Sequence, residues 1–295
     1  MNLSELENIC IVGPGLMGGS LGLALQATGY KGGIIALERD PSDLEAAINS
    51  GAVFSGATSI EELPDRIDLF CLAVPLSAMC GVLRQLAPRL DDPSVIVTDV
   101  GSVKVPVIDA ASSVMKYPGN FVGGHPMTGF RHQGVTYARA DLYQGATVIL
   151  TPISATNPQA LHDVRSMWEA IGARVTTMLP ARHDEVVGRV SHLPHAVVAT
   201  LLLLAARDEG LDVAATGLLD VTRIASRDTD LWLDTLVTNR DQVRRAIDQF
   251  IADLQRLDTW LERHEDGNIQ RLLVRAAQIR QEWVTRKFDH PKWID

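Results

Sequence analysis

The sequence predicts a two-domain α/β protein in which a doubly wound, mostly parallel sheet is followed by an all-helical second domain. Short apolar runs alternate with helical stretches before Pro180, and such alternation is typical of a parallel sheet covered on both faces. After Pro180 only long helical periodicity remains. With 295 residues the chain is also longer than one hydrophobic core usually needs. We therefore expect domains at 1–179 and 180–295.

The expected elements follow from this periodicity. Strands are expected at 9–12, 34–38, 67–74, 94–99, 119–123, 146–150 and 174–178. Helices of the first domain are expected at 16–28, 42–50, 76–88, 103–116 and 157–171. Helices of the second domain are expected at 183–209, 211–227, 229–236, 239–264 and 267–286. The run VVATLLLLAA is apolar nearly all round, so we expect it to be buried in the domain or in a dimer interface.

Composition narrows the classes of partner. The net charge is −9, which argues against a nucleic-acid partner because phosphate binding needs clustered Lys and Arg. The N-terminus lacks a basic stretch followed by an apolar one, and the apolar run 195–206 is short for a bilayer. Cys10 and Cys71 lie in strand-like runs and are expected to be buried thiols. We expect a cytoplasmic protein without a membrane partner.

A glycine-rich motif follows the first expected strand. The residues Gly13-Pro14-Gly15-Leu16-Met17-Gly18 fit G-x-G-x-x-G, and they open a helix in the first βαβ unit. Gly13 permits a tight turn, Gly15 lets the backbone approach a pyrophosphate, and Gly18 permits close packing of helix and strand. Free N–H groups at the helix start, including those of Leu16 and Met17, would face the phosphates. The motif predicts a Rossmann-type dinucleotide site.

The residue that reads the ribose is expected at the end of the second strand. Glu38 lies there, and its carboxylate would accept a hydrogen bond from a ribose 2′-OH and repel a 2′-phosphate. Arg39 follows directly and would pair with a 2′-phosphate instead. The pair favours NAD over NADP without excluding NADP. Val74 and Pro75, after the strand at 67–74, are expected to border the cofactor.

Two later segments are expected to face the nicotinamide. His125 lies between glycines and a proline in GGHPMTG, so we expect it on a loop, where its imidazole would take the proton that an alcohol loses as hydride leaves. A structural loop histidine is the alternative. Ser102, in DVGSVK, would orient that imidazole, bind substrate or cap the following helix.

The second domain offers further polar candidates. His192 and His195 lie three residues apart near His183, Asp184 and Glu185, but no complete ligand set for a metal is visible, so we expect none. Arg223 would clamp a substrate carboxylate with two hydrogen bonds, or form a surface pair with Asp220.

Taken together, the motifs resemble the prephenate/arogenate dehydrogenase family of tyrosine biosynthesis. The matching segments are GPGLMGGSLGLAL, DVGSVK, GGHPMTG, SHLPHAV and DVTRIASRDTDLW, followed by Asn239, and they occur in the family's order over most of the chain. The resemblance implies oxidative decarboxylation of a cyclohexadienol, with hydride passing from ring C4 to NAD(P) and CO₂ leaving C1. It also implies a homodimer formed through the helical domain.

The resemblance assigns roles to individual residues. His125 would hydrogen-bond the ring hydroxyl and act as the base, and Ser102 would hold the same hydroxyl or the imidazole. Arg223 would bind the ring carboxylate, and His195 would approach the substrate side chain. His192 would be a structural residue near the site, and Trp232 would pack in the helical domain.

One position departs from the family pattern. Many members have Thr-Glu or Thr-Lys after the GHPMxG segment, where this chain has Phe130-Arg131. We expect Arg131 to add a cation at the mouth of the substrate site and to change substrate choice. The chain also leaves no room after its helical core for an appended regulatory domain, so inhibition by tyrosine would act at the active site or the dimer interface.

Several functions remain open at this point. Prephenate is the favoured substrate, arogenate is the alternative that yields tyrosine directly, and 4-amino-4-deoxyprephenate is a third. A β-hydroxyacid dehydrogenase or imine reductase shares the two-domain plan, but the version that uses a helical-domain lysine does not fit, since 180–280 contains no lysine. A non-catalytic dinucleotide sensor would not need His125, Ser102 and Arg223 together.

Overall fold

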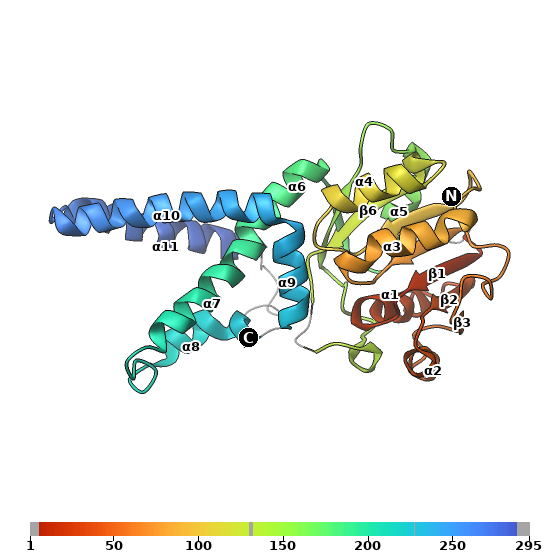
Figure 1. The fold of residues 1–295 in the computed structure, drawn as a ribbon, viewed down its shortest axis with the longest axis horizontal. Helices are drawn as coiled ribbons and strands as arrows, with labels where there is room; N and C mark the ends of the chain where they lie inside the picture. The colour runs from red at the N-terminus through yellow and green to blue at the C-terminus, as the bar shows by residue number, and fades with distance from the viewer. Residues whose placement is uncertain (1–5, 130–131, 227, 288–295) are drawn as a thin grey trace. The chain divides into compact units, whose positions relative to one another are not determined.

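The computed structural model describes residues 6–129, 132–226 and 228–287 in two compact units, 1–243 and 244–295, which are considered separately. The larger unit is built on one eight-stranded sheet (Figure 1). Its strands are β1 (Asn8–Val12), β2 (Gly33–Leu37), β3 (Ser55–Ala57), β4 (Leu69–Leu72), β5 (Ile96–Asp99), β6 (Phe121–Pro126), β7 (Thr147–Thr151) and β8 (Arg174–Thr177). The predicted boundary at 179/180 stays a prediction.

The strand order is β3-β2-β1-β4-β5-β6-β7-β8. Strands β1 to β6 pair in parallel, β7 is antiparallel to β6, and β8 is parallel to β7. The first six strands therefore have the doubly wound order in which the chain reverses direction between β1 and β4. This confirms the predicted fold class. Strand β3 was not predicted, because its sequence Ser-Gly-Ala is neither apolar nor β-branched.

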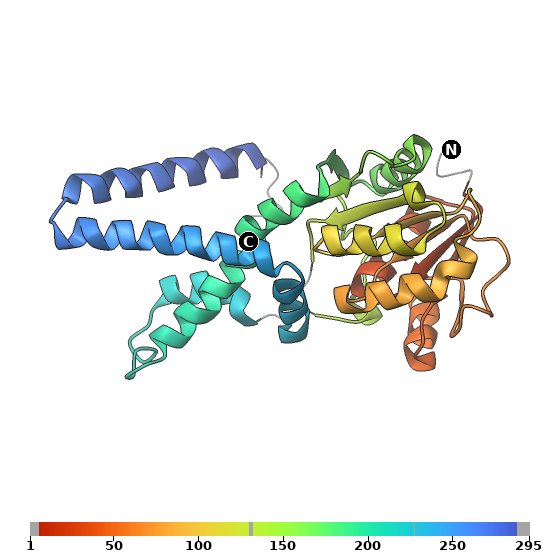
Figure 2. The ribbon, with the colours of Figure 1, turned by 45° about the horizontal axis from the view of Figure 1, so that its top comes forward.

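Helices cover both faces of the sheet. They are α1 (Leu16–Ala27), α2 (Pro41–Asn49), α3 (Leu76–Leu86), α4 (Val105–Val114) and α5 (Pro158–Ala170), with short 3₁₀ turns at Ala87–Arg89, Pro118–Asn120 and Val135–Tyr137. Helices α1, α2 and α5 share one buried cluster with Ile9 and Ile11, whereas α3 and α4 share another with Cys10 and Val12. Helices α3 and α4 lie side by side in both views (Figure 1 and Figure 2).

Strand β1 shows why the central strands read as continuous apolar runs. Its alternating side chains enter opposite clusters, so both faces are buried. Cys10 and Cys71 are fully buried, as predicted, and both are free thiols. Burial raises the pKa of Cys10 to about 12, with a smaller opposing effect of Arg89. These thiols are part of the core rather than reactive groups.

Helix α1 approaches its neighbours closely because it carries several glycines. A Cβ at Gly22 would lie 1.9 Å from the carbonyl oxygen of Ala52, and one at Gly19 would lie 2.8 Å from Cγ2 of Val135. The segment GGSLGLAL is therefore a packing surface as well as a helix.

The second half of the larger unit is helical. Its elements are α6 (Pro180–Val187), a π-helical turn (Gly188–His192), α7 (Leu193–Ala205), α8 (Thr216–Thr222), a 3₁₀ turn (Arg223–Ser226), α9 (Thr229–Thr238) and the first residues of α10 (Arg240–Glu262). The helix predicted at 183–209 is observed over 180–205, and it contains a π-helical turn at 188–192 that sequence periodicity cannot reveal. The prediction of a helix from residue 211 is wrong, since α8 starts only at Thr216.

The smaller unit comprises the remainder of α10 and helix α11 (Asp266–Lys287). A short turn joins them, and His264 adopts a left-handed φ of 53° there. The amide N–H of Glu265 donates to the carbonyl oxygen of Trp260 at 2.9 Å, which closes the end of α10. The helices predicted at 239–264 and 267–286 are confirmed in α10 and α11.

The run VVATLLLLAA was expected to be buried either in its domain or in a dimer interface. In the single chain, the first of these alternatives is wrong. Val198 is the single buried residue of α7 among those described, while Leu203 and Leu204 are 71% and 58% exposed. The continuous helical segment 180–205 is long and apolar enough to cross a membrane by length and composition, although the run 195–206 by itself is short. However, His183 and Asp184 within it are buried and hydrogen-bonded in the larger unit. The cytoplasmic location stays a prediction.

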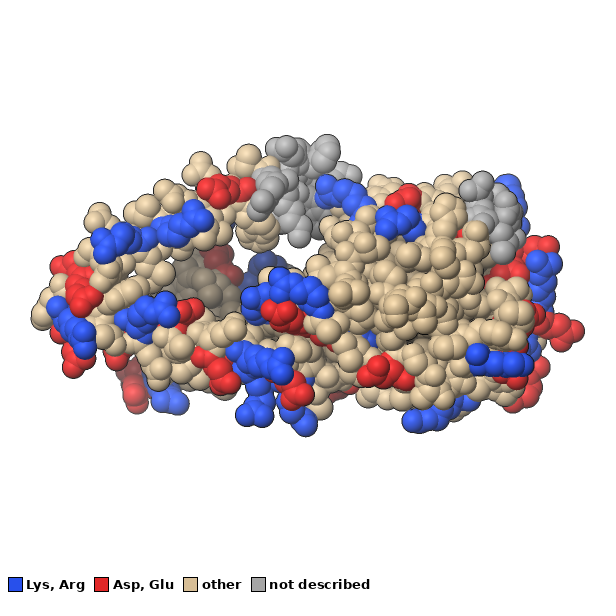
Figure 3. All heavy atoms as spheres, turned by 90° about the horizontal axis from the view of Figure 1, so that it is seen from above, with Lys and Arg blue, Asp and Glu red and all other residues tan. Residues whose placement is uncertain are grey.

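Charged side chains are mixed on the surface. Figure 3 shows one face, on which Lys and Arg are interspersed with Asp and Glu rather than gathered into a basic patch. This distribution accords with the excess of acidic residues in the sequence, 36 against 27 basic ones.

The close packing of α1 can be tested with a matched pair of glycine substitutions. We expect Gly22→Ala to destabilise the protein by about 1–3 kcal/mol, because its Cβ would collide with the backbone of Ala52. In Gly81→Ala, on the exposed side of α3, the Cβ meets nothing within 4 Å, so a gain of about 0.5–1 kcal/mol is expected from helix propensity. Urea denaturation measures both; equal stabilities of the two variants would contradict this account.

Candidate active site at the carboxyl edge of the sheet

The glycine-rich turn after β1 has the geometry that a dinucleotide needs. Gly13 adopts a φ of 82°, a conformation that other residues rarely tolerate, and its N–H donates to Leu37 O at 3.0 Å. A Cβ at Gly18 would lie 2.5 Å from Gly13 O and 2.7 Å from Cγ2 of Ile11, so this position packs helix against strand. These two glycines have the structural roles predicted for them.

The space beside Gly15 is open. A Cβ at Gly15 meets nothing within 4 Å, and Gly15 caps α1 without any side-chain hydrogen bond. Helix α1 begins at Leu16-Met17, so its first backbone N–H groups face this open space. The positive end of the helix dipole points in the same direction. These residues fit the pyrophosphate of a dinucleotide.

Two further predicted cofactor contacts lie at the same edge. Val74 and Pro75 connect β4 to α3, and Cγ1 of Val74 is 2.8 Å from the position of a Cβ on Gly13. Glu38 follows β2 directly and is half-buried, whereas Arg39 is exposed. The Glu38 backbone N–H donates to Ala57 O at 3.1 Å, which fixes the residue at the end of its strand. Their roles toward a cofactor stay predictions.

His125 is placed differently from the prediction. It is a residue of strand β6, opposite Ile149 of β7, and not part of a loop. The predicted strand ended at residue 123, because glycines and proline usually end strands. In the structure β6 continues through them to Pro126, and all of its residues are buried. His125 is only 9% exposed. Because β6 runs parallel to β5, His125 lies at the same sheet edge as the residues that follow β5.

A hydrogen-bonded chain of three side chains starts at His125. Its Nδ1 lies 2.8 Å from Nε2 of His183, and Nδ1 of His183 lies 2.7 Å from Oδ1 of Asp184. The two imidazole rings meet edge to face at 5.0 Å between centroids. Asp184 also accepts hydrogen bonds from the N–H groups of Lys104 and Val105, each at 2.8 Å.

The predicted role of Ser102 as the cap of the following helix is wrong. Helix α4 begins at Val105 with Lys104 as its N-cap residue, and the Asp184 carboxylate supplies the capping acceptor from another helix. Oγ of Ser102 instead lies 3.2 Å from Oγ1 of Thr235 on α9. Ser102 is half-buried at the sheet edge, where it remains a candidate for substrate binding.

A buried ion pair lies behind His125. Lys104 and Asp99 are both fully buried, and Nζ of Lys104 donates to the Asp99 carboxylate and to Gly124 O. Asp99 also accepts from the N–H groups of Gly124 at 3.1 Å and Gly101 at 2.9 Å. The pair therefore fixes the backbone next to His125, and its loss would leave a buried charge unpaired.

Burial and neighbouring charges keep the histidines of the site neutral. Burial, followed by His183, Lys104 and His192, holds the pKa of His125 well below 6.5. Burial also lowers the pKa of His183, against the opposing effect of its hydrogen bond to Asp184. The pKa of His192 falls to about 4, again mainly through burial. A neutral imidazole is the form that can accept a proton.

The second histidine pair lies on the π-turn and the start of α7. Nδ1 of His192 accepts a hydrogen bond from Nδ2 of Asn239 at 3.0 Å. His195 donates from Nδ1 to Ser191 O at 3.0 Å and stacks on Trp232 with 3.2 Å between ring centroids. Trp232 thus fixes the orientation of His195 and packs among the helices, as expected.

Helix α9 contacts the sheet edge at a second point. Asp234 accepts hydrogen bonds from the N–H and Oγ of Ser77 at 3.0 and 3.1 Å, and so caps the N-terminus of α3. Arg223 is exposed at the start of the 3₁₀ turn after α8, and its approach to a substrate stays a prediction. Arg131 lies outside the described residues.

Sequence reasoning missed the partners of His125. His183, Asp184, Asp234 and Thr235 were not expected at the site, since His183 and Asp184 were considered only as possible metal ligands. The available signal was a His-Asp pair on a helix that follows Pro180, but only the fold brings it to β6. Within the described ranges, no group of three or more His, Cys, Asp or Glu side chains is arranged to hold a metal ion.

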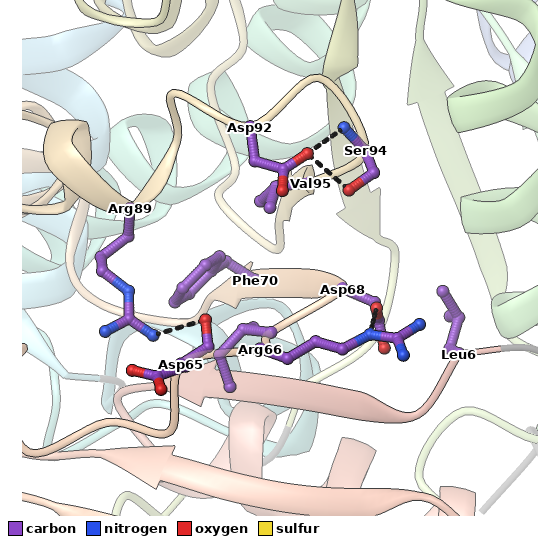
Figure 4. Close-up of a pocket in the computed structure, with 10 residues that line it drawn as sticks. Leu6, Asp65, Arg66, Asp68, Phe70, Arg89, Asp92, Ser94 and Val95 are labelled. Atoms are coloured by element: carbon purple, nitrogen blue, oxygen red, sulfur yellow. Dashed lines mark hydrogen bonds and ion pairs between the residues drawn. The ribbon is translucent and has the colours of Figure 1, made fainter.

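A cavity of about 380 Å³ lies at the opposite, amino end of the strands (Figure 4). Its lining includes Asp65, Arg66, Asp68, Arg89 and Asp92. These groups bind one another or nearby backbone: Arg66 pairs with Asp68 at 3.0 Å, Arg89 donates to Asp65 O at 3.3 Å, and Asp92 accepts from Ser94 at 2.8 Å. They stabilise the turns before β4 and β5, so we place the active site at the carboxyl edge.

Comparison with known protein families agrees with this geometry. The family described as "Prephenate dehydrogenase, nucleotide-binding domain" matches residues 21–177, and "Prephenate dehydrogenase, dimerization domain" matches residues 179–275. The chain belongs to the prephenate dehydrogenase family. The resemblance read from the sequence motifs is thereby confirmed.

Relatives of this family member cover nearly its whole length. It is 32% identical to prephenate dehydrogenase of Bacillus subtilis over 93% of this chain and 75% of the relative. It is also 32% identical to cyclohexadienyl dehydrogenase of Zymomonas mobilis over 98% of this chain and 99% of that protein. Among solved structures, prephenate dehydrogenase from Aquifex aeolicus in complex with hydroxyphenyl propionate and NAD+ superposes with a TM-score of 0.89, at 33% identity over 94% and 98% of the two chains.

Proposed function

We propose that this member of the prephenate dehydrogenase family oxidatively decarboxylates prephenate to 4-hydroxyphenylpyruvate in tyrosine biosynthesis. The observation that carries the proposal is His125, a buried and neutral imidazole at the carboxyl edge of the sheet, where the open space beside Gly15 also lies. The names of the relatives from Bacillus subtilis and Zymomonas mobilis support the same reaction.

The residues of the chain supply positioning and proton transfer. A bound nicotinamide dinucleotide provides the hydride acceptor. His125 accepts the proton of the ring hydroxyl while the C4–H bond breaks, and CO₂ then leaves C1 as the ring becomes aromatic. Ser102 orients the hydroxyl, and Arg223 and His195 bind the carboxylate and the side chain of the substrate. Because aromatisation makes the reaction strongly downhill, orientation is the main task of the protein.

We further infer that NAD is the preferred cofactor. Glu38 is half-buried directly after β2, where a carboxylate accepts a hydrogen bond from the ribose 2′-OH and repels a 2′-phosphate. The Aquifex aeolicus structure, described as a complex with NAD+, supports this choice.

The reaction is tested by following reduced nicotinamide with prephenate or arogenate, each with NAD or NADP. We expect the highest kcat/KM with prephenate and NAD. His125→Asn should lower kcat by roughly 10²–10⁴-fold while NAD still binds, since it removes the base. Arg223→Lys should mainly raise the KM for substrate, because a single ammonium replaces a two-point contact.

The same assay tests the departure at residue 131. Arg131→Ala should change the ratio of the Michaelis constants for prephenate and arogenate if this cation influences substrate choice. Full turnover by His125→Asn, or silence of the native protein in all four combinations while NAD binds, would contradict the proposed reaction. A higher kcat/KM with arogenate would reassign the substrate within the same chemistry.

Cofactor choice is tested at Glu38. Glu38→Ala should shift the ratio of kcat/KM for NAD over that for NADP by at least about tenfold toward NADP, which corresponds to the loss of one charge-assisted hydrogen bond and a repulsion. Arg39→Ala is the matched control on the neighbouring residue and should leave the preference for NAD intact. The native protein could instead prefer NADP and lose that preference in Arg39→Ala alone. That outcome would contradict the assignment of cofactor choice to Glu38.

We also propose that two copies of the chain form a dimer through the helical region. Large apolar side chains are exposed there: Leu203, Leu204, Leu219, Val221 and Leu233 are 54–71% exposed. A soluble monomer rarely exposes so much apolar surface. A second copy is the fitting occupant, because residues 179–275 match a domain described as a dimerization domain.

Sedimentation velocity tests the dimer. We expect a species of twice the 32.1 kDa chain mass, and we expect Leu203→Glu/Leu219→Glu to shift the population toward monomer, because buried carboxylates oppose association. Phe54→Glu, at an apolar position of the sheet region that is 55% exposed, is the control and should stay dimeric. A native protein that sediments as a single 32.1 kDa species would contradict the proposal.

A further inference from the structure

The protonation pattern of His125 follows from the hydrogen bonds behind it. Asp184 accepts from two backbone N–H groups, one at each carboxylate oxygen, so its third contact, with Nδ1 of His183, makes that nitrogen a donor. In a neutral imidazole only one nitrogen carries hydrogen, so Nε2 of His183 must then be an acceptor. It lies 2.8 Å from Nδ1 of His125, which is therefore the donor.

Because Nδ1 of His125 carries the hydrogen, Nε2 of His125 keeps its lone pair. No hydrogen bond to that nitrogen occurs within the described part of the chain, and His125 keeps slight exposure while His183 is fully buried. The nitrogen that can reach a substrate is thus the basic one. In the opposite tautomer, Nε2 would carry hydrogen and could not accept a proton from a hydroxyl.

The same contacts determine where positive charge goes when His125 is protonated. Lys104 is buried nearby and, like His192, opposes a charge on His125. Among the described residues, the one carboxylate linked to His125 through hydrogen bonds is Asp184, with His183 between them. His183 is fully buried and Asp184 is 3% exposed, so water does not screen this chain.

We propose that His183 and Asp184 are positioning residues that fix His125 as the Nδ1–H tautomer, keep its Nε2 lone pair for the substrate hydroxyl, and stabilise the charge His125 gains. This inference rests on the proposed function. As the C4–H electron pair leaves as hydride, the hydroxyl O–H bond breaks and an Nε2–H bond forms on His125. When the C1–carboxylate bond breaks, its electron pair enters the ring, and Nε2 returns the proton to the phenolate oxygen. No net proton is released.

The simpler alternative is that Asp184 only caps α4. A cap contributes to stability but has no influence on the tautomer or basicity of His125. The two readings therefore differ in measurements on the imidazoles themselves and in the pH dependence of turnover.

The first test needs no substrate. Nitrogen-15 NMR of the full-length protein labelled at histidine reports which ring nitrogen carries hydrogen. We expect hydrogen on Nδ1 of both His125 and His183 at pH 7.5, assigned by His125→Asn and His183→Gln. Hydrogen on Nε2 of His125 would overturn the proposal. Because this result does not depend on turnover, it stands apart from the success or failure of the proposed reaction.

The second test compares two variants of similar size at residue 183. In His183→Gln, the amide oxygen can still accept from Nδ1 of His125, whereas His183→Leu leaves that donor unpartnered. We expect kcat to fall in the order native, His183→Gln, His183→Leu, with the Leu variant lower than native by roughly 10²–10⁴-fold and KM little changed. Equal rates for the Gln and Leu variants would overturn the proposal.

The third test removes the negative charge. Asp184→Asn should lower the plateau of kcat by roughly 10²–10⁴-fold and move the acid limb of its pH profile to lower pH, because the carboxylate hydrogen-bonded to His125 through His183 is gone. The control is Asn157→Ala, which removes the cap of α5 and should cost similar stability with native kinetics. An Asp184→Asn enzyme with a native plateau and acid limb would overturn the proposal.

Discussion

The Asp184 carboxylate is the group on which the arrangement of the site depends. From its place on α6 it holds the first two N–H groups at the start of α4, and through His183 it reaches His125 on β6. Three elements that are distant in the sequence thus share one buried anion. The nearby Lys104–Asp99 pair gives the same region a fixed backbone, because Asp99 binds two N–H groups as well as the ammonium. Buried charges that are fully paired in this way define one geometry rather than several.

Much of the sheet region was predictable because its signals are local. The strands around Gly13 read as apolar runs, the G-x-G-x-x-G turn needs a positive φ at Gly13, and the position of Glu38 follows from the length of one βαβ unit. The short strand β3 escaped because pairing with β2, not composition, makes it a strand. The π-turn at 188–192 escaped because its residues have ordinary helix-forming periodicity.

The site was predictable only in part, for a related reason. His125 and Ser102 were found because each follows or ends a strand at the carboxyl edge of the sheet. Their partners lie 58 and 133 residues further along the chain, in helices whose placement no local pattern determines. The expectation of a loop at His125 was wrong because the register of β6 with β7 overrides the tendency of Gly and Pro to end a strand. Likewise, nothing near Ser102 reveals that a distant aspartate caps α4.

The polar contacts between the helices and the sheet region also bear on how the protein unfolds. Residues beyond 180 make all of these contacts. Asp184 and His183 on α6 bind the start of α4 and His125 on β6, while Asp234 and Thr235 on α9 bind Ser77 on α3 and Ser102 after β5. If α6 and α9 detached while the sheet stayed intact, several of these donors and acceptors would lose their hydrogen-bond partners. Such partial opening is costly, so we expect the sheet and these helices to unfold together. The hydrogen-bonded chain at His125 is therefore complete only when α6 is packed against the sheet.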